Sequence, residues 1–175
     1  AAARALGHGL GELPKDPATG RPAWPPGLLG SITHTAGFCG AVVASAGAAR
    51  ALGLDAEPDA PLEAELEPIL LTAAERRRLA ARPEPERRAL LRWVFCAKEA
   101  FYKAQHPLTD TFLEFTDVEL EWALAHQSAL PTRAEFHAAP LGHSRVRAST
   151  RGGRGRVLRV DGLLLASYEL PALDD

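Results

Sequence analysis

Three acidic residues and one lysine have the types and spacings of a site for a metal ion and a phosphate. Asp55 and Glu57 stand two residues apart in GLDAEP, and Glu99 and Lys103 stand four residues apart in AKEAFYK. Residues two apart share a face of a strand, and residues four apart share a face of a helix. Neighbouring carboxylates repel each other, and a hard cation such as Mg²⁺ relieves that repulsion. One hypothesis is that Asp55, Glu57 and Glu99 together bind Mg²⁺, with Lys103 placed to meet a phosphate on the same ion.

Both parts of this site also have a simpler interpretation. Gly53, Asp55 and Pro58 are residue types that form turns, and GLDAEP taken alone favours a turn over a strand by roughly two to one. Glu99 and Lys103 taken alone fit a solvated ion pair along a helix, worth about 0.2–0.5 kcal/mol. The metal site is favoured only when the two stretches are considered together.

Two further segments offer candidate residues. His34 ends the stretch GSITH, where the hydroxyls of Ser31 and Thr33 and a histidine suit a phosphate contact. A packed or surface histidine at a strand end or turn is the commoner case. Thr72 and Glu75 have the S/T-x-x-E spacing of a capping box. That box explains Glu75 at least as well as a catalytic role does, and the two roles are compatible only if the carboxylate turns toward the metal.

The elements that must position these residues form a mixture of helices and strands, typical of an α+β fold. Small apolar residues at 40–47 suit a buried strand, and GLDAE suits a second strand beside it. Helices are expected at 1–12, 71–82 and 85–105, and Pro107 lies just beyond the last of them. A proline-rich loop is expected at 13–29. Strands are expected at 112–124 and 134–140, followed by a hairpin at 155–170 that turns at Asp161-Gly162.

Composition limits the class of protein. The chain has 175 residues, 46% of them apolar, which suits one domain with a sizeable core. The net charge of −2 argues against a nucleic-acid-binding protein. Two cysteines without a metal or disulfide spacing, no signal peptide and no apolar run of membrane length predict a cytoplasmic protein. Among 20 basic residues the lysines are Lys15, Lys98 and Lys103, and the last two flank Glu99, which indicates a site that needs a compact ammonium.

Three ordered blocks resemble a known enzyme family. GSITH, GLDAE and FCAKEAFYKA are similar in order and spacing to the patterns G-S-[IL]-[ST]-H, G-[IVL]-D-x-E and [WF]-x-x-K-E-x-x-x-K of the surfactin-type, single-chain phosphopantetheinyl transferases. RPAWPPG and PLTDTFLEFTDV resemble the segments that precede and follow these blocks, so the match covers roughly residues 20 to 118. The resemblance implies transfer of phosphopantetheine from coenzyme A to a serine of an apo acyl or peptidyl carrier protein, with release of adenosine 3′,5′-bisphosphate. The carrier would serve fatty acid, polyketide or nonribosomal peptide synthesis.

The resemblance also implies roles for individual acidic residues. Asp55, Glu57 and Glu99 would bind Mg²⁺, or Mn²⁺, on the pyrophosphate of coenzyme A. Glu99 is the leading candidate for the base that deprotonates the carrier serine. Glu75 falls at a position that the family links to metal-bound water. Which of Glu75 and Glu99 acts as the base stays open.

The phosphate contacts follow from the same resemblance. Lys103 would contact the pyrophosphate, and His34 would contact a phosphate of coenzyme A, with Ser31 and Thr33 shaping the turn. The hydroxyl of Thr33 stands where many members have serine. Phe95 stands where many have tryptophan, which is a change of packing.

One family feature is not found. Members usually grip the 3′-phosphate of coenzyme A with an arginine in an N-terminal arm, and we expect that arm to be missing here. Arg4, Lys15 and Arg21 are the nearby basic candidates. The fold that the family implies is a monomer of two similar α/β halves related by a pseudo-twofold axis, here about 1–52 and 53–175, with the ligand between them.

Two alternatives and one further feature complete the expectations. The same acids could serve a Mg²⁺-dependent phosphodiesterase or nuclease, although the chain lacks a basic stripe. A non-catalytic module that binds carrier proteins or nucleotides is the other alternative. RASTRGGRGR (147–156) is basic and glycine-rich, and a solvated hairpin tip is favoured over a surface that steers acidic carriers by roughly three to one.

Overall fold

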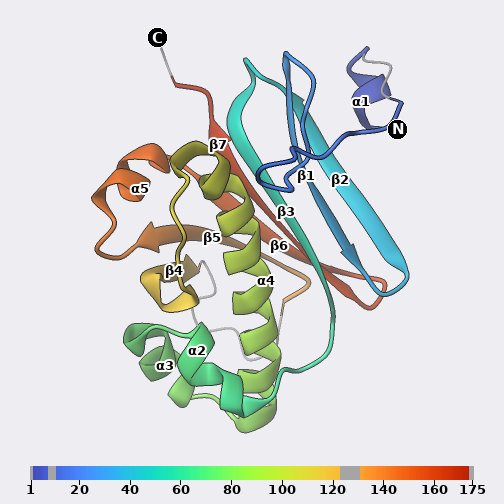
Figure 1. The fold of residues 1–175 in the computed structure, drawn as a ribbon. Coiled ribbons are helices and arrows are strands. Elements are labelled where there is room, and N and C mark those ends of the chain that lie inside the picture. The colour runs from blue at the N-terminus through green and yellow to red at the C-terminus, as the bar shows by residue number, and fades with distance from the viewer. Residues whose placement is uncertain (1, 8–10, 123–130, 174–175) are drawn as a thin grey trace.

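Two antiparallel sheets and one long helix make up the fold, which a computed structural model describes for residues 2–7, 11–122 and 131–173. The larger sheet has five strands in the order β3-β7-β6-β5-β4, and β1 and β2 form a two-stranded sheet (Figure 1). The strands are β1 (Leu28–Thr35), β2 (Phe38–Ser45), β3 (Ala49–Pro58), β4 (Val118–Trp122), β5 (Arg133–Pro140), β6 (Arg154–Val160) and β7 (Leu163–Pro171). The α+β class is confirmed, whereas the pseudo-twofold relation between two halves stays a prediction.

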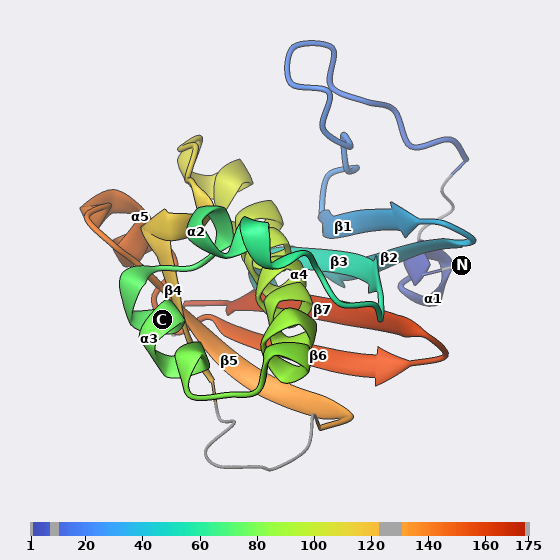
Figure 2. The same cartoon turned by 90° about the horizontal axis from the view of Figure 1, so that it is seen from below.

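The helices lie mainly on one side of the larger sheet. They are α1 (Ala2–Ala5), α2 (Glu67–Leu70), α3 (Ala73–Ala80), α4 (Glu84–Thr109) and α5 (Ser144–Ser149), with 3₁₀ turns at Ala64–Leu66 and Phe115–Asp117. Helix α4 crosses the sheet, with α2 and α3 packed at one of its ends (Figures 1 and 2). None of these described helices is both long and apolar enough to cross a membrane.

The core lies between α4 and the five-stranded sheet. Leu91, Val94 and Phe101 recur at helical spacing along α4 and are fully buried. The ring of Phe101 meets Tyr168 of β7 edge-on, with the centroids 5.1 Å apart. Burying each large apolar side chain contributes about 1.5–3 kcal/mol to stability, so these contacts fix α4 on the five-stranded sheet.

Helix α4 is longer than expected. It runs from Glu84 to Thr109 with Pro107 inside it, so the expectation that it ends before Pro107 is wrong. A proline here removes only one hydrogen bond of the last turn, which the final residues tolerate. The helix ends where Asp110 adopts a left-handed φ of 50° and its N–H donates to the carbonyl of His106 at 2.9 Å.

The stretch GLDAEP forms a strand, so the turn favoured for it in isolation is wrong. It lies within β3, which pairs with β7 from Ala49 to Pro58. Gly53 shows why the strand can approach α4: a Cβ built there would lie 1.8 Å from the carbonyl oxygen of Ala100. This close packing against a helix outweighs the local turn preference and turns Asp55 toward α4.

Side chains rather than backbone pairs join the two sheets. The Leu54 N–H donates to the hydroxyl of Ser31 and the Ala56 N–H donates to the hydroxyl of Thr33, both at 3.0 Å. These two bonds satisfy N–H groups on the free edge of β3, which are buried by β1. The seam between β1 and β3 therefore uses two hydroxyls in place of a ladder.

Several expected elements are confirmed. Thr72 caps α3, with its side chain accepting from the Glu75 N–H and the Glu75 carboxylate accepting from the Thr72 N–H, so the capping box is present. The hairpin turn at Asp161-Gly162 joins β6 to β7, and both residues have positive φ, 49° and 77°. The expected strands at 40–47 and 134–140 correspond to β2 and β5.

Other expectations need correction. The strand expected at 112–124 begins only at Val118, because 115–117 form a 3₁₀ turn, and 123–124 lie outside the described residues. In the helix expected at 1–12, the described helical residues are 2–5, and 8–10 lie outside the description.

The basic segment 147–156 is not a hairpin tip. It contains the end of α5, a turn and the start of β6, so that expectation is wrong. Three carbonyls around this turn accept hydrogen bonds from the Arg50 guanidinium: Ser149 at 2.9 Å, Arg151 at 3.2 Å and Pro171 at 2.9 Å. Arg50 therefore fixes the turn to the sheet.

Candidate active site

Asp55 lies at the centre of the candidate site. Its side chain is buried on β3, where Oδ1 accepts from Lys103 Nζ at 2.7 Å and from the Thr33 hydroxyl at 3.4 Å. The second oxygen, Oδ2, is buried without a hydrogen-bond partner in the part of the chain that the structure describes. A buried carboxylate oxygen without a donor is costly, and a cation bound there would remove that cost.

Glu57 lies two residues along the same strand face. Burial raises the pKa of its carboxyl, the charge of Asp55 raises it further, and Arg92 on α4 opposes both. Arg92 Nη1 donates to Glu57 Oε2 at 2.7 Å. The acid is therefore half-buried, near a like charge and held by one arginine.

Glu99 faces the two strand acids from α4. Burial raises the pKa of its carboxyl, and Asp55 and then Glu57 add to this while Lys103 opposes it. None of the described residues donates a hydrogen bond to Glu99. The three acids predicted to share a site thus interact electrostatically across the β3–α4 interface.

The donor set suits a hard cation, although the side chains do not form a finished metal site. Within the described ranges, no three His, Cys, Asp or Glu side chains stand close enough together to hold an ion as they are placed. Asp55 Oδ2 has no partner, and the pKa values of Glu57 and Glu99 are raised mainly by burial and then by the charge of Asp55. Carboxylate oxygens in such an arrangement are what Mg²⁺ and Mn²⁺ take as ligands.

A cavity of about 350 Å³ is lined by Lys103, the partner of Asp55, and by none of the three acids; we call it the cavity beside the acids. It lies between α4, β3 and the residues that lead into β1, and its lining includes Arg21, Ser31, Tyr102, Lys103 and His106. The structure therefore brings together Arg21, Ser31 and Lys103, three of the residues predicted to contact coenzyme A. Lys103 connects the acids to the cavity, because its Nζ is bound to Asp55 and the residue also lines the cavity.

Arg21 is tied to the end of α4. Its Nη2 donates to His106 Nδ1 at 2.6 Å and to Asp110 Oδ1 at 2.8 Å. Burial lowers the pKa of His106 and the charge of Arg21 lowers it further, so the imidazole that accepts this bond is neutral. The segment before β1 is fixed in this way to the wall of the cavity.

The hydroxyls and the histidine of GSITH face opposite ways. Ser31 and Thr33 point toward β3 and bridge the two sheets, whereas His34 is exposed on the other face of β1. Alternation along a strand requires this separation. The structure does not bring His34 into contact with the acids, and its proposed phosphate contact stays a prediction.

Arg4 and Lys15 lie apart from the cavity. Arg4 is exposed on α1, which packs near β2, and Lys15 is exposed in the segment 11–27, where it forms an isolated bridge with Pro22. Neither residue lines the cavity beside the acids. Of the three basic candidates, only Arg21 reaches it.

Glu75 lies in a different environment from Glu99. Its side chain is 2% exposed, and its oxygens accept from Lys98 Nζ at 2.7 Å, the Thr72 N–H at 2.8 Å and the Leu120 N–H at 2.8 Å. Lys98 and Glu99 are neighbours in sequence, but successive residues point about 100° apart around a helix. Their side chains therefore serve two different sites, and the catalytic role of Glu75 stays a prediction.

Sequence reasoning missed three contacts of the site. Arg92 pairs with Glu57, Lys98 pairs with Glu75, and the Tyr102 ring stacks on His106 with centroids 4.9 Å apart. Arg92 lies seven residues before Glu99, close to two helical turns, so helical spacing could have placed both on one face. The Lys98–Glu75 contact joins two helices and leaves no such signal.

The family assignment follows from this arrangement and from similarity to known proteins. The model of the 4′-phosphopantetheinyl transferase superfamily matches residues 51–149, which contain the three acids and Lys103. The chain belongs to this superfamily. The model of the 4′-phosphopantetheinyl transferase N-terminal domain matches residues 1–44.

Three curated 4′-phosphopantetheinyl transferases are similar to the chain. Svp of Streptomyces mobaraensis is 43% identical over 104 residues, which cover 58% of this chain and 42% of Svp. PptT of Mycobacterium tuberculosis is 44% identical over 104 residues, covering 58% of this chain and 44% of PptT. Npt of Nocardia iowensis is 36% identical over 160 residues, covering 87% of this chain and 69% of Npt. The matched part of this chain thus spans less than half the length of the first two relatives.

Proposed function

We propose that this protein transfers the phosphopantetheine group of coenzyme A to a serine of an apo acyl or peptidyl carrier protein. The observation that carries the proposal is the buried, unpartnered Oδ2 of Asp55 among three coupled acids beside a cavity lined by Lys103. Membership of the superfamily supports the same reaction.

The cavity beside the acids is the proposed site of coenzyme A. Lys103 is placed to contact the pyrophosphate, because its ammonium lies between Asp55 and the cavity. Arg21 supplies a second cation in the lining, while Tyr102 and His106 offer a stacked aromatic pair. Lysine and arginine are the side chains that bind phosphate esters most strongly. His34, at the exposed face of β1, completes the proposed phosphate contacts.

Asp55, Glu57 and Glu99 are the residues that would hold Mg²⁺ or Mn²⁺. When bound, the ion supplies positive charge that neutralises the pyrophosphate and aligns it for attack. Before that, Arg92 and Lys103 hold the carboxylates of Glu57 and Asp55 in place. We propose that Glu57 exchanges its contact with Arg92 for the metal.

Glu99 is the proposed base. Its carboxylate has no hydrogen-bond donor among the described residues, so it is free to accept a proton, and its raised pKa makes it a better acceptor. The serine Oγ gives its proton to Glu99 and forms a bond to the phosphorus nearest to the pantetheine. The bond from that phosphorus to the bridging oxygen breaks, and adenosine 3′,5′-bisphosphate leaves. The three contacts of Glu75 support a structural role for that residue.

The proposal also covers the oligomeric state, the location and the symmetry of the protein. The protein acts as a monomer, in the cytoplasm, where coenzyme A and carrier proteins occur. Its two parts have the pseudo-twofold relation that the family suggests.

An intact-mass assay tests the reaction. The protein is mixed with coenzyme A, Mg²⁺ and an apo carrier protein, and the carrier is weighed. We expect the carrier to gain one phosphopantetheine group, and we expect EDTA or Asp55→Ala to abolish that gain. Glu135→Gln is the matched control, since Glu135 is an exposed acid of β5 outside the site.

Different failures have different meanings. Transfer that survives EDTA and Asp55→Ala would contradict the role of the acids. If neither this chain nor a chain extended to the length of the relatives modifies any of several carriers, the transferase proposal is wrong. Hydrolysis of phosphate diesters by the same acids would then be assayed. Unchanged coenzyme A binding in Asp55→Ala and Glu99→Ala, without transfer by the wild type, would indicate a binding module.

A further inference from the structure

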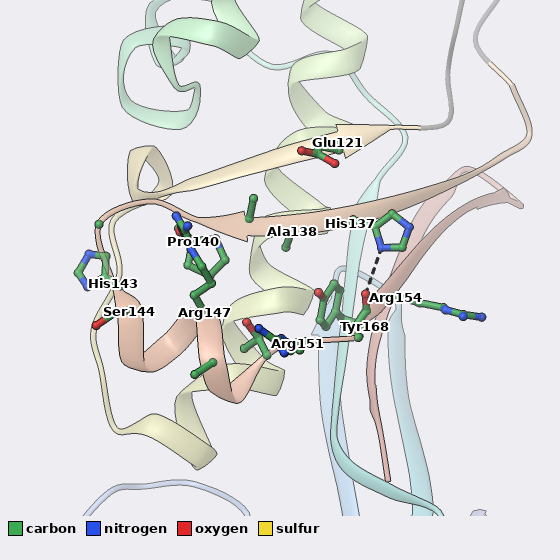
Figure 3. Close-up of a pocket in the computed structure, with 16 residues that line it drawn as sticks. Glu121, His137, Ala138, Pro140, His143, Ser144, Arg147, Arg151, Arg154 and Tyr168 are labelled. Carbon is green, nitrogen blue, oxygen red and sulfur yellow. Dashed lines mark hydrogen bonds between the residues drawn. The ribbon is translucent and has the colours of Figure 1, made fainter. Parts of the chain in front are cut away.

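A second and larger cavity lies where the five-stranded sheet splays open. Strand β5 pairs with β6 only from Arg133 to Phe136, whereas residues 137–140 pair with β4 alone. Helix α5 and the turn after it border the resulting gap, which forms an open cavity of about 930 Å³ (Figure 3). It shares no lining residue with the cavity beside the three acids.

The lining of this cavity is strongly cationic. It contains three arginines and two histidines but only one acid, and these are Arg147, Arg151, Arg154, His137, His143 and Glu121. Among the described residues, the guanidinium groups of Arg151 and Arg154 have no ion-pair or hydrogen-bond partner. Asp117 lies 3.5 Å from His143 and Glu121 is in the lining, so the unpaired positive charge is that of the Arg151 and Arg154 guanidinium groups. Two such groups at one cavity favour an anionic ligand.

Two of the nitrogen-bearing side chains in the lining are held in fixed directions. Arg147 donates from Nε and Nη2 to the carbonyl of Pro140, at 3.3 and 2.9 Å, which leaves its other N–H groups available. His137 Nδ1 lies 3.2 Å from the carbonyl of Gly153, so that nitrogen is the donor and Nε2 is left for a ligand (Figure 3). Side chains fixed by their neighbours lose little freedom when a ligand binds.

The turn that presents Arg151 is equally fixed. The guanidinium of Arg50 donates to the carbonyls of Ser149 and Arg151, and the Thr150 hydroxyl donates to the carbonyl of Val146 at 2.9 Å. Arg151 and Arg147 thus project toward the cavity from a rigid turn and from α5 (Figure 3). A rigid concave lining from three elements suits a small molecule better than it suits the flat contact of an acidic protein surface.

We propose that this second cavity binds an organic phosphate of about nucleotide size that carries at least two phosphate charges. The volume lies within the range of small-molecule sites, and guanidinium groups bind phosphate through paired, charge-assisted hydrogen bonds. Apolar atoms of Ala138 and Ala148 in the lining suit the organic part of such a molecule. The site is separate from the proposed transferase site and does not depend on it.

Nuclear magnetic resonance can locate the binding. Inorganic pyrophosphate and adenosine 5′-diphosphate are titrated, without divalent cations, into protein labelled with ¹⁵N. We expect saturable shifts of the amide signals of Gly152 and Gly153, which line the second cavity. The amide of Gly30, which lines the cavity beside the acids, reports separately on binding there.

Matched variants test the assignment. Arg151→Ala and Arg154→Ala should each weaken the response at Gly153 at least about tenfold, as loss of a charged hydrogen bond implies. Arg145→Ala is the control, because Arg145 is an exposed arginine of α5 that does not line the cavity. Its effect should be less than about twofold. In the described part of the chain, the side chains of Arg151 and Arg154 make no hydrogen bond or ion pair, so we expect both variants to fold.

Three outcomes would overturn the proposal. The first is a shift only at Gly30, and the second is a response at Gly153 that Arg151→Ala and Arg154→Ala leave unchanged. The third is no saturation up to about 10 mM of either probe, since even a Kd of 1 mM corresponds to only about 4 kcal/mol of binding. Shifts of the same amides by an acidic carrier protein alone would instead identify a protein-docking surface.

Discussion

Helix α4 contributes to two acid–lysine pairs with the same separation and different surroundings. Lys98 Nζ lies 2.7 Å from Glu75, and Lys103 Nζ lies 2.7 Å from Asp55. In the first pair both side chains are 2% exposed. In the second pair Lys103 is 29% exposed and Asp55 is 7% exposed.

The hydrogen bonds of the two pairs differ more than their burial. All three N–H groups of Lys98 are used, by Glu75 and by the carbonyls of Leu70 and Phe115. Both oxygens of Glu75 are also bound. In contrast, Asp55 keeps one buried oxygen without a donor. A fully satisfied pair holds elements together, and an incompletely satisfied one is available to a ligand.

The largest expected effect is on the satisfied pair. Lys98→Met leaves the buried carboxylate of Glu75 without its cation and should cost about 3–5 kcal/mol of unfolding free energy. Lys103→Met is the matched change and should cost about 1 kcal/mol, because Lys103 is partly solvated. Urea denaturation of both variants measures the difference. Equal losses of unfolding free energy would show that the two ion pairs contribute equally to stability, contrary to this prediction.

The second effect separates the two candidate bases. Glu99→Gln should lower the transfer rate about 100-fold or more, because the amide cannot accept the serine proton. Glu75→Gln should lower stability while the rate per folded molecule stays near that of the wild type. Transfer rates are compared with the folded fraction from circular dichroism. A slow, fully folded Glu75→Gln protein would reverse the assignment.

The third effect concerns the metal and needs no carrier protein. A ligand at ten times its Kd stabilises a protein by about 1.4 kcal/mol. Mg²⁺ should therefore raise the unfolding free energy of the wild type by about that amount, and EDTA should reverse it. Asp55→Asn and Glu99→Gln should lose the gain, whereas Lys103→Met should keep part of it. An equal gain in all four proteins would place the ion elsewhere.

The smallest effect is a pH dependence of the protein without metal. The pKa values of Glu57 and Glu99 are raised in the folded state, with burial as the main cause. Such groups stabilise the fold below their unfolded pKa, about 4.3, and that contribution is lost as the pH rises through their folded values. Chelated wild type should thus lose stability as the pH rises above about 4.3, and Glu99→Gln should flatten this dependence. Urea midpoints at several pH values test this, and parallel curves for both proteins would contradict it.

Local patterns predicted much of this architecture. The capping box of Thr72 and Glu75 and the turn at Asp161-Gly162 depend on neighbours within three residues, so the sequence indicates both. The shared face of Glu99 and Lys103 follows from helical spacing alone. GLDAE is a strand, as its place after the small apolar residues at 40–47 suggests, whereas GLDAEP in isolation favours a turn because its packing on α4 through Gly53 is a long-range contact.

The remaining errors also have physical causes. Helix α5 has only six residues, too few to show an amphipathic period. Pairs such as Lys98 with Glu75 join separate elements, and no spacing reveals them. The alternation of β1 places His34 on the face opposite Ser31 and Thr33, and its phosphate contact stays a prediction. Local spacing indicated acids that face each other from β3 and α4, but it did not indicate Arg92, which holds Glu57. The roles of these acids at a metal ion stay predictions.

The hydroxyl seam between β1 and β3 limits how the protein can vary. Ser31 and Thr33 accept from backbone N–H groups of β3 through an oxygen one bond from Cβ. Alanine or valine would leave a buried donor without an acceptor, and asparagine would force the strands apart. Serine and threonine both place a hydroxyl oxygen one bond from Cβ, at the same distance from the backbone. Serine and threonine are therefore the two residues that suit positions 31 and 33, and exchanging one for the other should keep the hydrogen bonds that connect the two sheets.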